Sequence, residues 1–261
     1  EVALPYPVPV LPGAHDTDCG IMGLGALPEQ PGVLCNVMGT FDLHAFYANG
    51  SGASDVTLRG RLGEYKPILS GYPSLGSSLE WFAKEFSLKN DGGTFSRMLD
   101  ACRFDAGCPV MMAPLFMEER VAVKGLSLTR GMGDIFCALV EGVTFECADA
   151  VRLMDEAMGR EQGRGIEAIR ASGGASRTDS WLRLRASVFG KPIVKAAHAQ
   201  AASVGAAIIA GCAVGCYGGY KEAADHMVPP GEVFLPDAGQ RQRYLAKEEE
   251  YRRFRAAALG W

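Results

Sequence analysis

Several common functional signatures are missing from this sequence of 261 residues, and each absence narrows the function. There is no G-x-x-x-x-G-K-[ST] phosphate loop, which excludes the P-loop class of nucleotide-binding proteins. Gly20, Gly23 and Gly25 lack the spacing of a dinucleotide-binding loop. The formal net charge is −4, so the chain has no basic field that would gather nucleic acid or anionic lipid. We therefore expect neither nucleic acid nor a membrane among its partners.

Long apolar runs and targeting segments are missing as well. The longest apolar stretch, residues 201–214, contains Ser and Gly and is shorter than the ~20 apolar residues that a membrane-spanning helix needs. No charged segment followed by an apolar h-region comes after Glu1, so we expect no secretion signal and a cytoplasmic protein. The absent initiator methionine suits an excised piece of a longer protein.

The cysteines form no C-x-x-C pair and show no spacing typical of a small disulfide framework. Because metal sites usually show such closely spaced ligands, we expect no metal site built by the protein itself. We interpret all of the cysteines as buried, reduced thiols, namely Cys19, Cys35, Cys102, Cys108, Cys137, Cys147, Cys212 and Cys216.

The composition is that of an ordinary globular domain, with 48% hydrophobic and 21% charged residues. A chain of this length buries roughly 70–75% of its unfolded surface, so a sizeable core is available. Its second half alternates strand and helix patterns, which predicts a sheet with helices packed on its faces. The expected elements there are a strand over 166–171, a helix over 178–189, a strand over 192–196, a helix over 200–214, and a charged helix over 240–258 whose charges we interpret as a solvated face.

The first half opens with a proline-rich stretch, residues 2–12, that we expect to be extended. Asp16 and Asp18 follow at the start of a predicted helix over 16–27, where a first turn favours negative charge. Further expected elements are strands over 32–40, 41–48 and 65–69, a helix over 75–86, a loop at 90–93, a buried strand over 109–116 and a long helix starting near Asp134.

Two glycine turns in this pattern could approach a phosphate group. Gly39-Thr40 joins two predicted strands, so its main-chain N–H groups and the Thr hydroxyl can reach an anion without a Cβ in the way. Gly173-Gly174-Ala175 lies between a predicted strand and a helix, where a nucleotide could rest against bare backbone. Taken alone, each can equally be a plain turn or a tightly packed connection.

Several glycine-punctuated patterns follow one another in a fixed order along nearly the whole chain. Together they resemble the C-terminal half of the FGGY family of carbohydrate kinases. The patterns are Gly13-Ala14-His15-Asp16, Met38-Gly39-Thr40, Gly125-Leu126-Ser127-Leu128-Thr129 with Ala138-Leu139-Val140-Glu141-Gly142, Ala171-Ser172-Gly173-Gly174-Ala175, and Gln200 to Ala207.

The resemblance implies a fold and a domain organisation. The fold would be an α/β, ribonuclease H-like domain of the actin, Hsp70 and hexokinase type, with a mixed sheet flanked by helices. Residues 1–261 would form the C-terminal, nucleotide-binding domain, and the N-terminal sugar-binding half would be absent from this chain. Its partners would then be that N-terminal half, a sugar or polyol substrate and, as a further candidate, a second copy forming a homodimer.

The resemblance also implies a reaction, in which ATP, bound with Mg²⁺, transfers its terminal phosphoryl group to a sugar or polyol hydroxyl. Asp16 matches the carboxylate that serves as base in the family. We interpret the neighbouring His15 as a positioning or packing residue. Asp18 competes for that role, although a charge at a helix N-terminus also explains it. Gly39, Thr40, Gly173, Gly174 and Ala175 would contact the nucleotide. Without its other half the chain should be inactive.

Two points stay open. A non-catalytic nucleotide-binding or regulatory module could use the same fold, because fold does not fix function. The sequence also departs from the family pattern at Gln200, Arg183 and Ser187, and only residues 121–124 separate Arg120 from Gly125, where the family has a longer, proline-containing loop. Either that loop is shortened here or a stretch is missing. The identity of the sugar or polyol is not specified by these residues.

Overall fold

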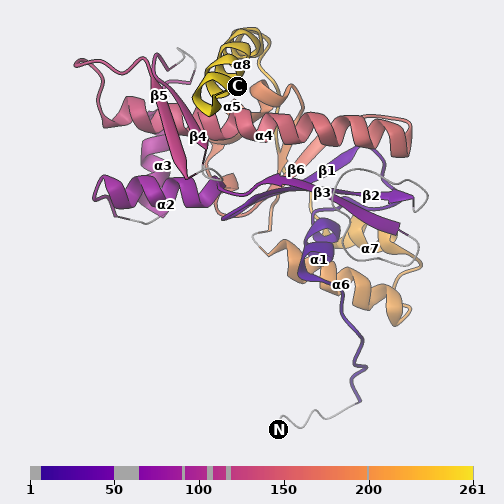
Figure 1. Ribbon diagram of the computed structural model, residues 1–261. Helices are drawn as coiled ribbons and strands as arrows, with labels where there is room; N and C mark the ends of the chain where they lie inside the picture. The colour runs from indigo at the N-terminus through magenta and orange to yellow at the C-terminus, as the bar shows by residue number, and fades with distance from the viewer. Residues whose placement is uncertain are drawn as a thin grey trace.

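A six-stranded mixed sheet forms the centre of the protein (Figure 1). The computed structural model describes residues 7–49, 65–89, 92–104, 108–115, 119–198 and 200–260. The strands lie in the order β3-β2-β1-β6-β7-β8, where β1, β6 and β7 are parallel and β2, β3 and β8 are antiparallel to their neighbours. Their bounds are β1 Val33–Met38, β2 Asp42–Asn49, β3 Tyr65–Tyr72, β6 Ala168–Ser172, β7 Ile193–Lys195 and β8 Glu232–Phe234.

Helices cover both faces of this sheet, which confirms the predicted mixed sheet flanked by helices. The long helix α4 (Met132–Gln162) and α5 (Asp179–Phe189) pack on one face. The other face is covered by α1 (Asp16–Gly23), α6 (Ala201–Ala213) and α7 (Tyr220–Met227). The remaining helices are α2 (Leu75–Glu85) and α3 (Gly92–Ala101) near one end of α4, and α8 (Ala238–Leu259), which forms an outer layer over it.

The helix starting near Asp134 is confirmed. The Asp134 carboxylate accepts a hydrogen bond from the Gly131 N–H over 3.0 Å, which satisfies a main-chain donor that the first helical turn leaves unpaired. The helix ends at Gly163, whose φ of 71° is the left-handed conformation that glycine adopts at helix C-termini. Helix α6 also forms where expected, and none of the described helices has the length and apolar character needed to cross a membrane.

Backbones approach each other closely where α1 meets α6. A Cβ at Gly23 would overlap the carbonyl group of Ala201, and one at Gly205 would overlap that of Cys19. Only glycine lets the two helices come so near. This contact fixes the position of α1, and with it that of Asp16 and Asp18.

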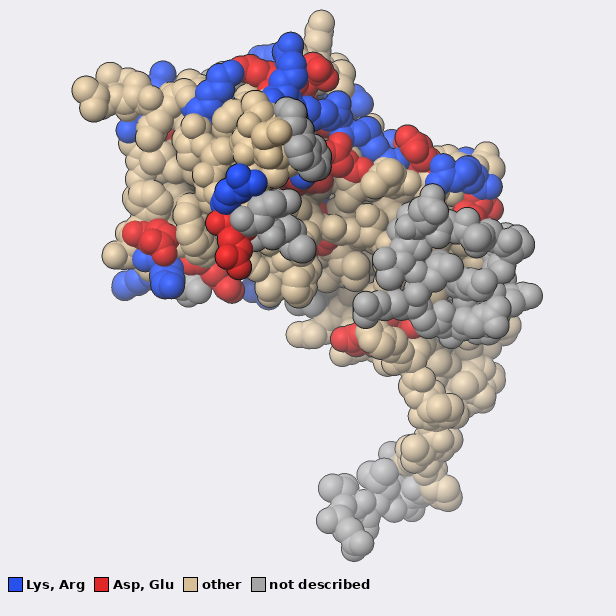
Figure 2. Space-filling model, viewed as in Figure 1, with Lys and Arg blue, Asp and Glu red and all other residues tan. Residues whose placement is uncertain are grey.

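The charge-rich helix α8 is only partly solvated, which corrects the sequence interpretation. Tyr244 and Tyr251 are buried, and Lys247 forms an ion pair with the buried carboxylate of Glu141 on α4. Within the helix, Glu248 and Arg252 form an i,i+4 ion pair at 2.8 Å. On the face shown in Figure 2, acidic and basic side chains are interspersed around α4 and α8.

Two other predictions need correction. Gly92 and Gly93 belong to α3 rather than to a loop, while Asn90 and Asp91 lie outside the described residues. Cys102 and Cys137 form a disulfide bond between the end of α3 and α4, and Cys216 is exposed, so the cysteines are not uniformly buried and reduced.

The connection between Arg120 and Gly125 is a strand. β5 (Arg120–Lys124) pairs antiparallel with β4 (Met111–Leu115), where a buried strand was predicted. Gly125 then turns with a φ of +80°, close to the carbonyl group of Pro109. Residues 116–118, just before β5, lie outside the described part.

Candidate functional site

The predicted hairpin turn lies between two cavities. Met38 pairs with Asp42 in the β1–β2 register, which leaves residues 39–41 as the turn, and the Gly39 N–H donates to the Phe41 carbonyl oxygen over 3.0 Å. Gly39 and Thr40 line one cavity, which we call the α2–α5 cavity. Phe41 and Asp42 line the other, which we call the α1 cavity.

The α2–α5 cavity has a volume of about 600 Å³, within the usual range of small-molecule sites. Its walls come from the β1–β2 turn, the start of α2, one side of α3, and the segment that leads into α5. The lining residues are Met38, Gly39, Thr40, Leu75, Gly76, Leu79, Glu80, Gly93, Phe95, Ser96, Leu99, Gly174, Ala175, Arg177, Thr178 and Trp181. Both predicted glycine turns, 134 residues apart in numbering, thus face one space.

The glycines of the second turn have different roles. Gly174 lines the cavity, and a Cβ placed on it would meet no protein atom within 4 Å, so its backbone lies bare. Gly173 does not line the cavity. Its φ is +101°, and a Cβ would lie 2.5 Å from the Met38 carbonyl oxygen, so packing against β1 explains this glycine. A short 3₁₀ helix, η2 (Ala175–Arg177), connects the turn to α5.

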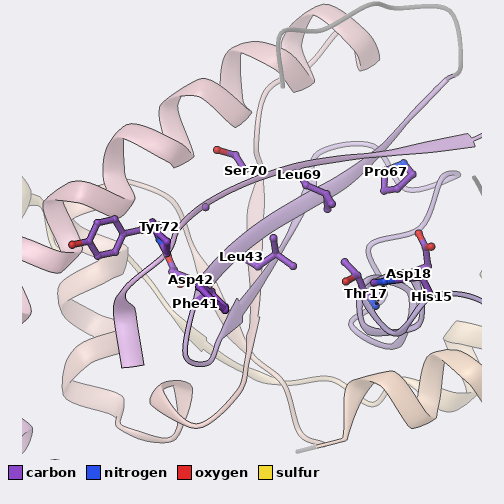
Figure 3. A pocket seen from close by; sticks show the side chains of 12 residues that line it. His15, Thr17, Asp18, Phe41, Asp42, Leu43, Pro67, Leu69, Ser70 and Tyr72 are labelled. Carbon is purple, nitrogen blue, oxygen red and sulfur yellow. Dashed lines mark hydrogen bonds between the residues drawn. The ribbon is translucent and has the colours of Figure 1, made fainter. Parts of the chain in front are cut away.

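The α1 cavity has a volume of about 470 Å³. Figure 3 shows Thr17, His15 and Asp18 together at the first turn of α1, across from side chains of β2 and β3. Phe41, at the rim, is 60% exposed. The other lining residues are Asp42, Leu43, Pro67, Leu69, Ser70, Gly71, Tyr72 and Pro73.

Asp16 and Asp18 differ sharply in environment. The Asp16 side chain is 86% exposed, and its Oδ1 lies 2.8 Å from His15 Nδ1 and 2.7 Å from the Thr17 main-chain nitrogen. Asp18 is buried and lines the α1 cavity, and its Oδ1 accepts a hydrogen bond from the Tyr47 hydroxyl over 3.2 Å. Burial raises the pKa of Asp18, although the bond from Tyr47 opposes this.

A fully buried polar cluster lies between the hairpin and α5. The Arg185 guanidinium donates to Asp42 Oδ2 over 2.7 Å and to Asn36 Oδ1 over 3.2 Å, and the Asn36 amide donates to Asp42 Oδ1 over 2.9 Å. Burial would raise the pKa of Asp42, but Arg185 and His44 hold it at about 2. For His44, burial lowers the pKa to about 4, aided by Arg185 and opposed by Asp42.

Sequence reasoning missed two walls of the α2–α5 cavity. The wall from α3, with Phe95, Ser96 and Leu99, was hidden because Gly92-Gly93 suggested a loop. The wall from α2 includes Gly76, whose N–H bonds to the Thr40 carbonyl oxygen. A glycine in the first turn of a predicted helix was the available signal for this close contact.

Comparison with known proteins gives one consistent picture. Residues 100–214 match the model of the FGGY family of carbohydrate kinases, C-terminal domain. A xylulose kinase of Bacillus subtilis (strain 168) is 23% identical over 259 residues, which cover 93% of this chain and 50% of the kinase. A glycerol kinase of Aromatoleum aromaticum is 27% identical over 254 residues, which cover 88% and 48% respectively. The chain therefore spans about half the length of these relatives.

The fold is shared with solved structures. The crystal structure of xylulose kinase from Rhodospirillum rubrum superposes with a TM-score of 0.80 and 21% sequence identity, covering 98% of this chain and 53% of that one. Ligand-bound xylulose kinase from Lactobacillus acidophilus gives a TM-score of 0.78 at 16% identity, covering 92% and 49%. The predicted fold class and the resemblance to an FGGY kinase C-terminal half are both confirmed.

Proposed function

We propose that this chain, which resembles the C-terminal half of the FGGY family of carbohydrate kinases, supplies the nucleotide-binding side and the catalytic carboxylate of an ATP-dependent sugar or polyol kinase. One observation carries this proposal. The Gly39-Thr40-Phe41 turn lies between a cavity lined by glycine backbone and a second cavity lined by the first turn of α1. Asp16 belongs to that turn, although His15, Thr17 and Asp18, and not Asp16 itself, line the cavity.

The nucleotide would occupy the α2–α5 cavity. The open space at Gly174 fits a ligand that lies against bare backbone, and the apolar wall of Leu79, Phe95 and Leu99 fits an adenine ring. Because the Gly39 N–H is already bonded to the Phe41 carbonyl oxygen, the Thr40 N–H, the Thr40 hydroxyl and the guanidinium of Arg177 would neutralise phosphate charge. Bound Mg²⁺ would supply further neutralisation of the phosphate oxygens.

The acceptor hydroxyl would approach from the side of α1. Asp16, exposed at the start of that helix, would accept the hydroxyl proton as the oxygen attacks the phosphoryl group. His15, 2.8 Å away, would orient the Asp16 carboxylate. We further propose that the substrate is a sugar or polyol and that an N-terminal half completes its pocket. Closure of two halves assembles such a site.

The test has two arms. Calorimetric titration of the 261-residue chain with MgATP and MgADP should show weak binding, and the chain alone should phosphorylate no sugar. The full-length protein should phosphorylate one member of a panel of ketoses and polyols in a coupled ADP-release assay. Rapid phosphorylation of a pentose by the chain alone would refute the proposal that activity requires an N-terminal half. Nucleotide binding by a full-length protein that phosphorylates nothing would favour the regulatory module instead.

A further inference from the structure

The polar cluster of Asn36, Asp42, His44 and Arg185 lies in an otherwise apolar core, and all of these side chains are 0% exposed. Burying charge is costly, and a buried ion pair is often no more stabilising than a well-packed apolar pair of similar volume. Its presence here calls for a role other than stability. The location of the cluster suggests one.

Asp42 is the first residue after the turn and forms the closing pair of the hairpin with Met38. Its side chain points toward α5, where it meets Arg185. Asn36, on the neighbouring strand, joins the two, because its amide donates to Asp42 Oδ1 over 2.9 Å and to the Leu43 carbonyl oxygen over 3.2 Å. The base of the turn is therefore held from both strands.

Arg185 connects this base to the opposite wall of the cavity. It belongs to α5, and Thr178 and Trp181, at the start of that helix, line the α2–α5 cavity. Its guanidinium is held further by the Phe189 ring, with a distance of 4.8 Å between Cζ and the ring centroid. The planar donor group reaches Asp42 and Asn36 together, which a lysine ammonium on its flexible stem would do less well.

We propose that Arg185 and Asp42 are positioning residues, which hold the Gly39-Thr40-Phe41 turn at a fixed place relative to α5 so that a nucleotide meets a preformed cavity. Only the statement that a nucleotide occupies this cavity rests on the proposed function. The fixed position of the turn is a property of the protein alone, and the Gly76 N–H reports it because that group donates to the Thr40 carbonyl oxygen over 3.0 Å.

The test compares two matched double variants. Asp42→Asn with Arg185→Met removes both charges of the cluster. Glu141→Gln with Lys247→Met removes another ion pair, between the buried Glu141 of α4 and the half-buried Lys247 of α8, and neither residue lines the α2–α5 cavity. Circular dichroism should show both variants folded.

Amide exchange followed by NMR gives the first readout. In the cluster variant the Gly76 amide should exchange at least about tenfold faster than in the unaltered chain, while amides in the middle of α4 keep their protection. The control variant should leave Gly76 unchanged. Equal protection of Gly76 in the cluster variant and the control would overturn the proposal.

Nucleotide affinity gives the second readout. The Kd for MgADP should rise about tenfold in the cluster variant and stay unchanged in the control. Should the unaltered chain bind no nucleotide, the proposed function fails, while the exchange of Gly76 still decides whether the cluster fixes the turn.

Arg185→Lys, which keeps the charge, is the variant to use if the double variant does not fold. It should give a smaller acceleration of Gly76 exchange, and no acceleration would count against the role of Arg185.

Discussion

The main-chain N–H of Gly76 donates a hydrogen bond to the carbonyl oxygen of Thr40 across 3.0 Å, so the first turn of α2 holds the β1–β2 turn from outside. A Cβ on residue 76 would lie 2.8 Å from the Gly39 carbonyl oxygen and 2.9 Å from the Thr40 Cα. Real Cβ atoms do not approach other atoms so closely, so this contact requires glycine at position 76.

Gly76→Ala should therefore displace the turn. Because the clashing atoms are backbone, they cannot rotate away, and we expect a loss of about 1–3 kcal/mol in the free energy of unfolding together with weaker MgADP binding. Chemical denaturation and calorimetry measure the two effects. Ser77→Ala, in the same turn of α2, is the matched control and should change neither. An unchanged affinity in Gly76→Ala would separate the turn from nucleotide binding.

Gly174→Val tests the opposite situation. A Cβ at Gly174 meets no protein atom within 4 Å and its φ of −60° suits any residue, so the variant should fold normally. The branched side chain would instead fill space that the nucleotide is proposed to use, and ATP affinity should fall by about tenfold or more. Gly159→Val, at another open glycine on α4, should bind like the unaltered chain. Equal affinities in both variants would mean that the turn has no ligand role.

The disulfide between Cys102 and Cys137 can be tested by counting the thiols that react before and after reduction. In the oxidised, unfolded protein six cysteines should react with a thiol reagent, and all eight after reduction. Since the bond closes a loop with a sequence separation of 35, Cys102→Ser should lower the free energy of unfolding by about 2–4 kcal/mol under oxidising conditions. Cys108→Ser, a free thiol, is the control and should cost much less. Eight reactive thiols before reduction would contradict the bond.

Local patterns predicted much of this fold, and contacts between distant residues account for most of what was missed. The hairpin at Gly39, the helix that starts near Asp134 and the alternation of strands and helices after residue 166 each depend on a few neighbouring residues, and each forms as expected. The Cys102–Cys137 bond joins segments that no local pattern relates. The Arg185–Asp42 ion pair spans 143 positions, so neither residue signals it alone.

His44 should make stability depend on pH. Its pKa is about 4 in the folded protein, chiefly because of burial, against 6.5 for a free side chain, so between these values the unfolded chain takes up a proton that the folded one does not. Stability should therefore fall as the pH is lowered from 6.5 to 4, by up to about 3 kcal/mol from this group.

His44→Leu should remove that part of the pH dependence. Neither ring nitrogen of His44 makes a hydrogen bond within the described part of the chain, so the substitution breaks none. Denaturation of both proteins at pH 7 and pH 4.5 measures the difference, and His226→Leu, on the surface of α7, is the control. An equally steep loss of stability in His44→Leu would show that other groups cause it.

The two carboxylates of α1 offer the sharpest test of the chemistry, in the full-length protein. Asp16→Asn keeps the size and the hydrogen-bonding capacity of an exposed side chain but removes the base, so kcat should drop by ~10²–10⁴-fold with nucleotide affinity little changed. Asp18→Asn should leave turnover nearly intact. Its amide oxygen can still accept the Tyr47 hydroxyl, and because burial already raises the Asp18 pKa, losing the charge is tolerable there. Steady-state kinetics on both variants separate the roles. If Asp18→Asn is the inactive enzyme, or Asp16→Asn turns over like the unaltered protein, the base lies elsewhere, and the buried carboxylate that lines the α1 cavity becomes the first candidate.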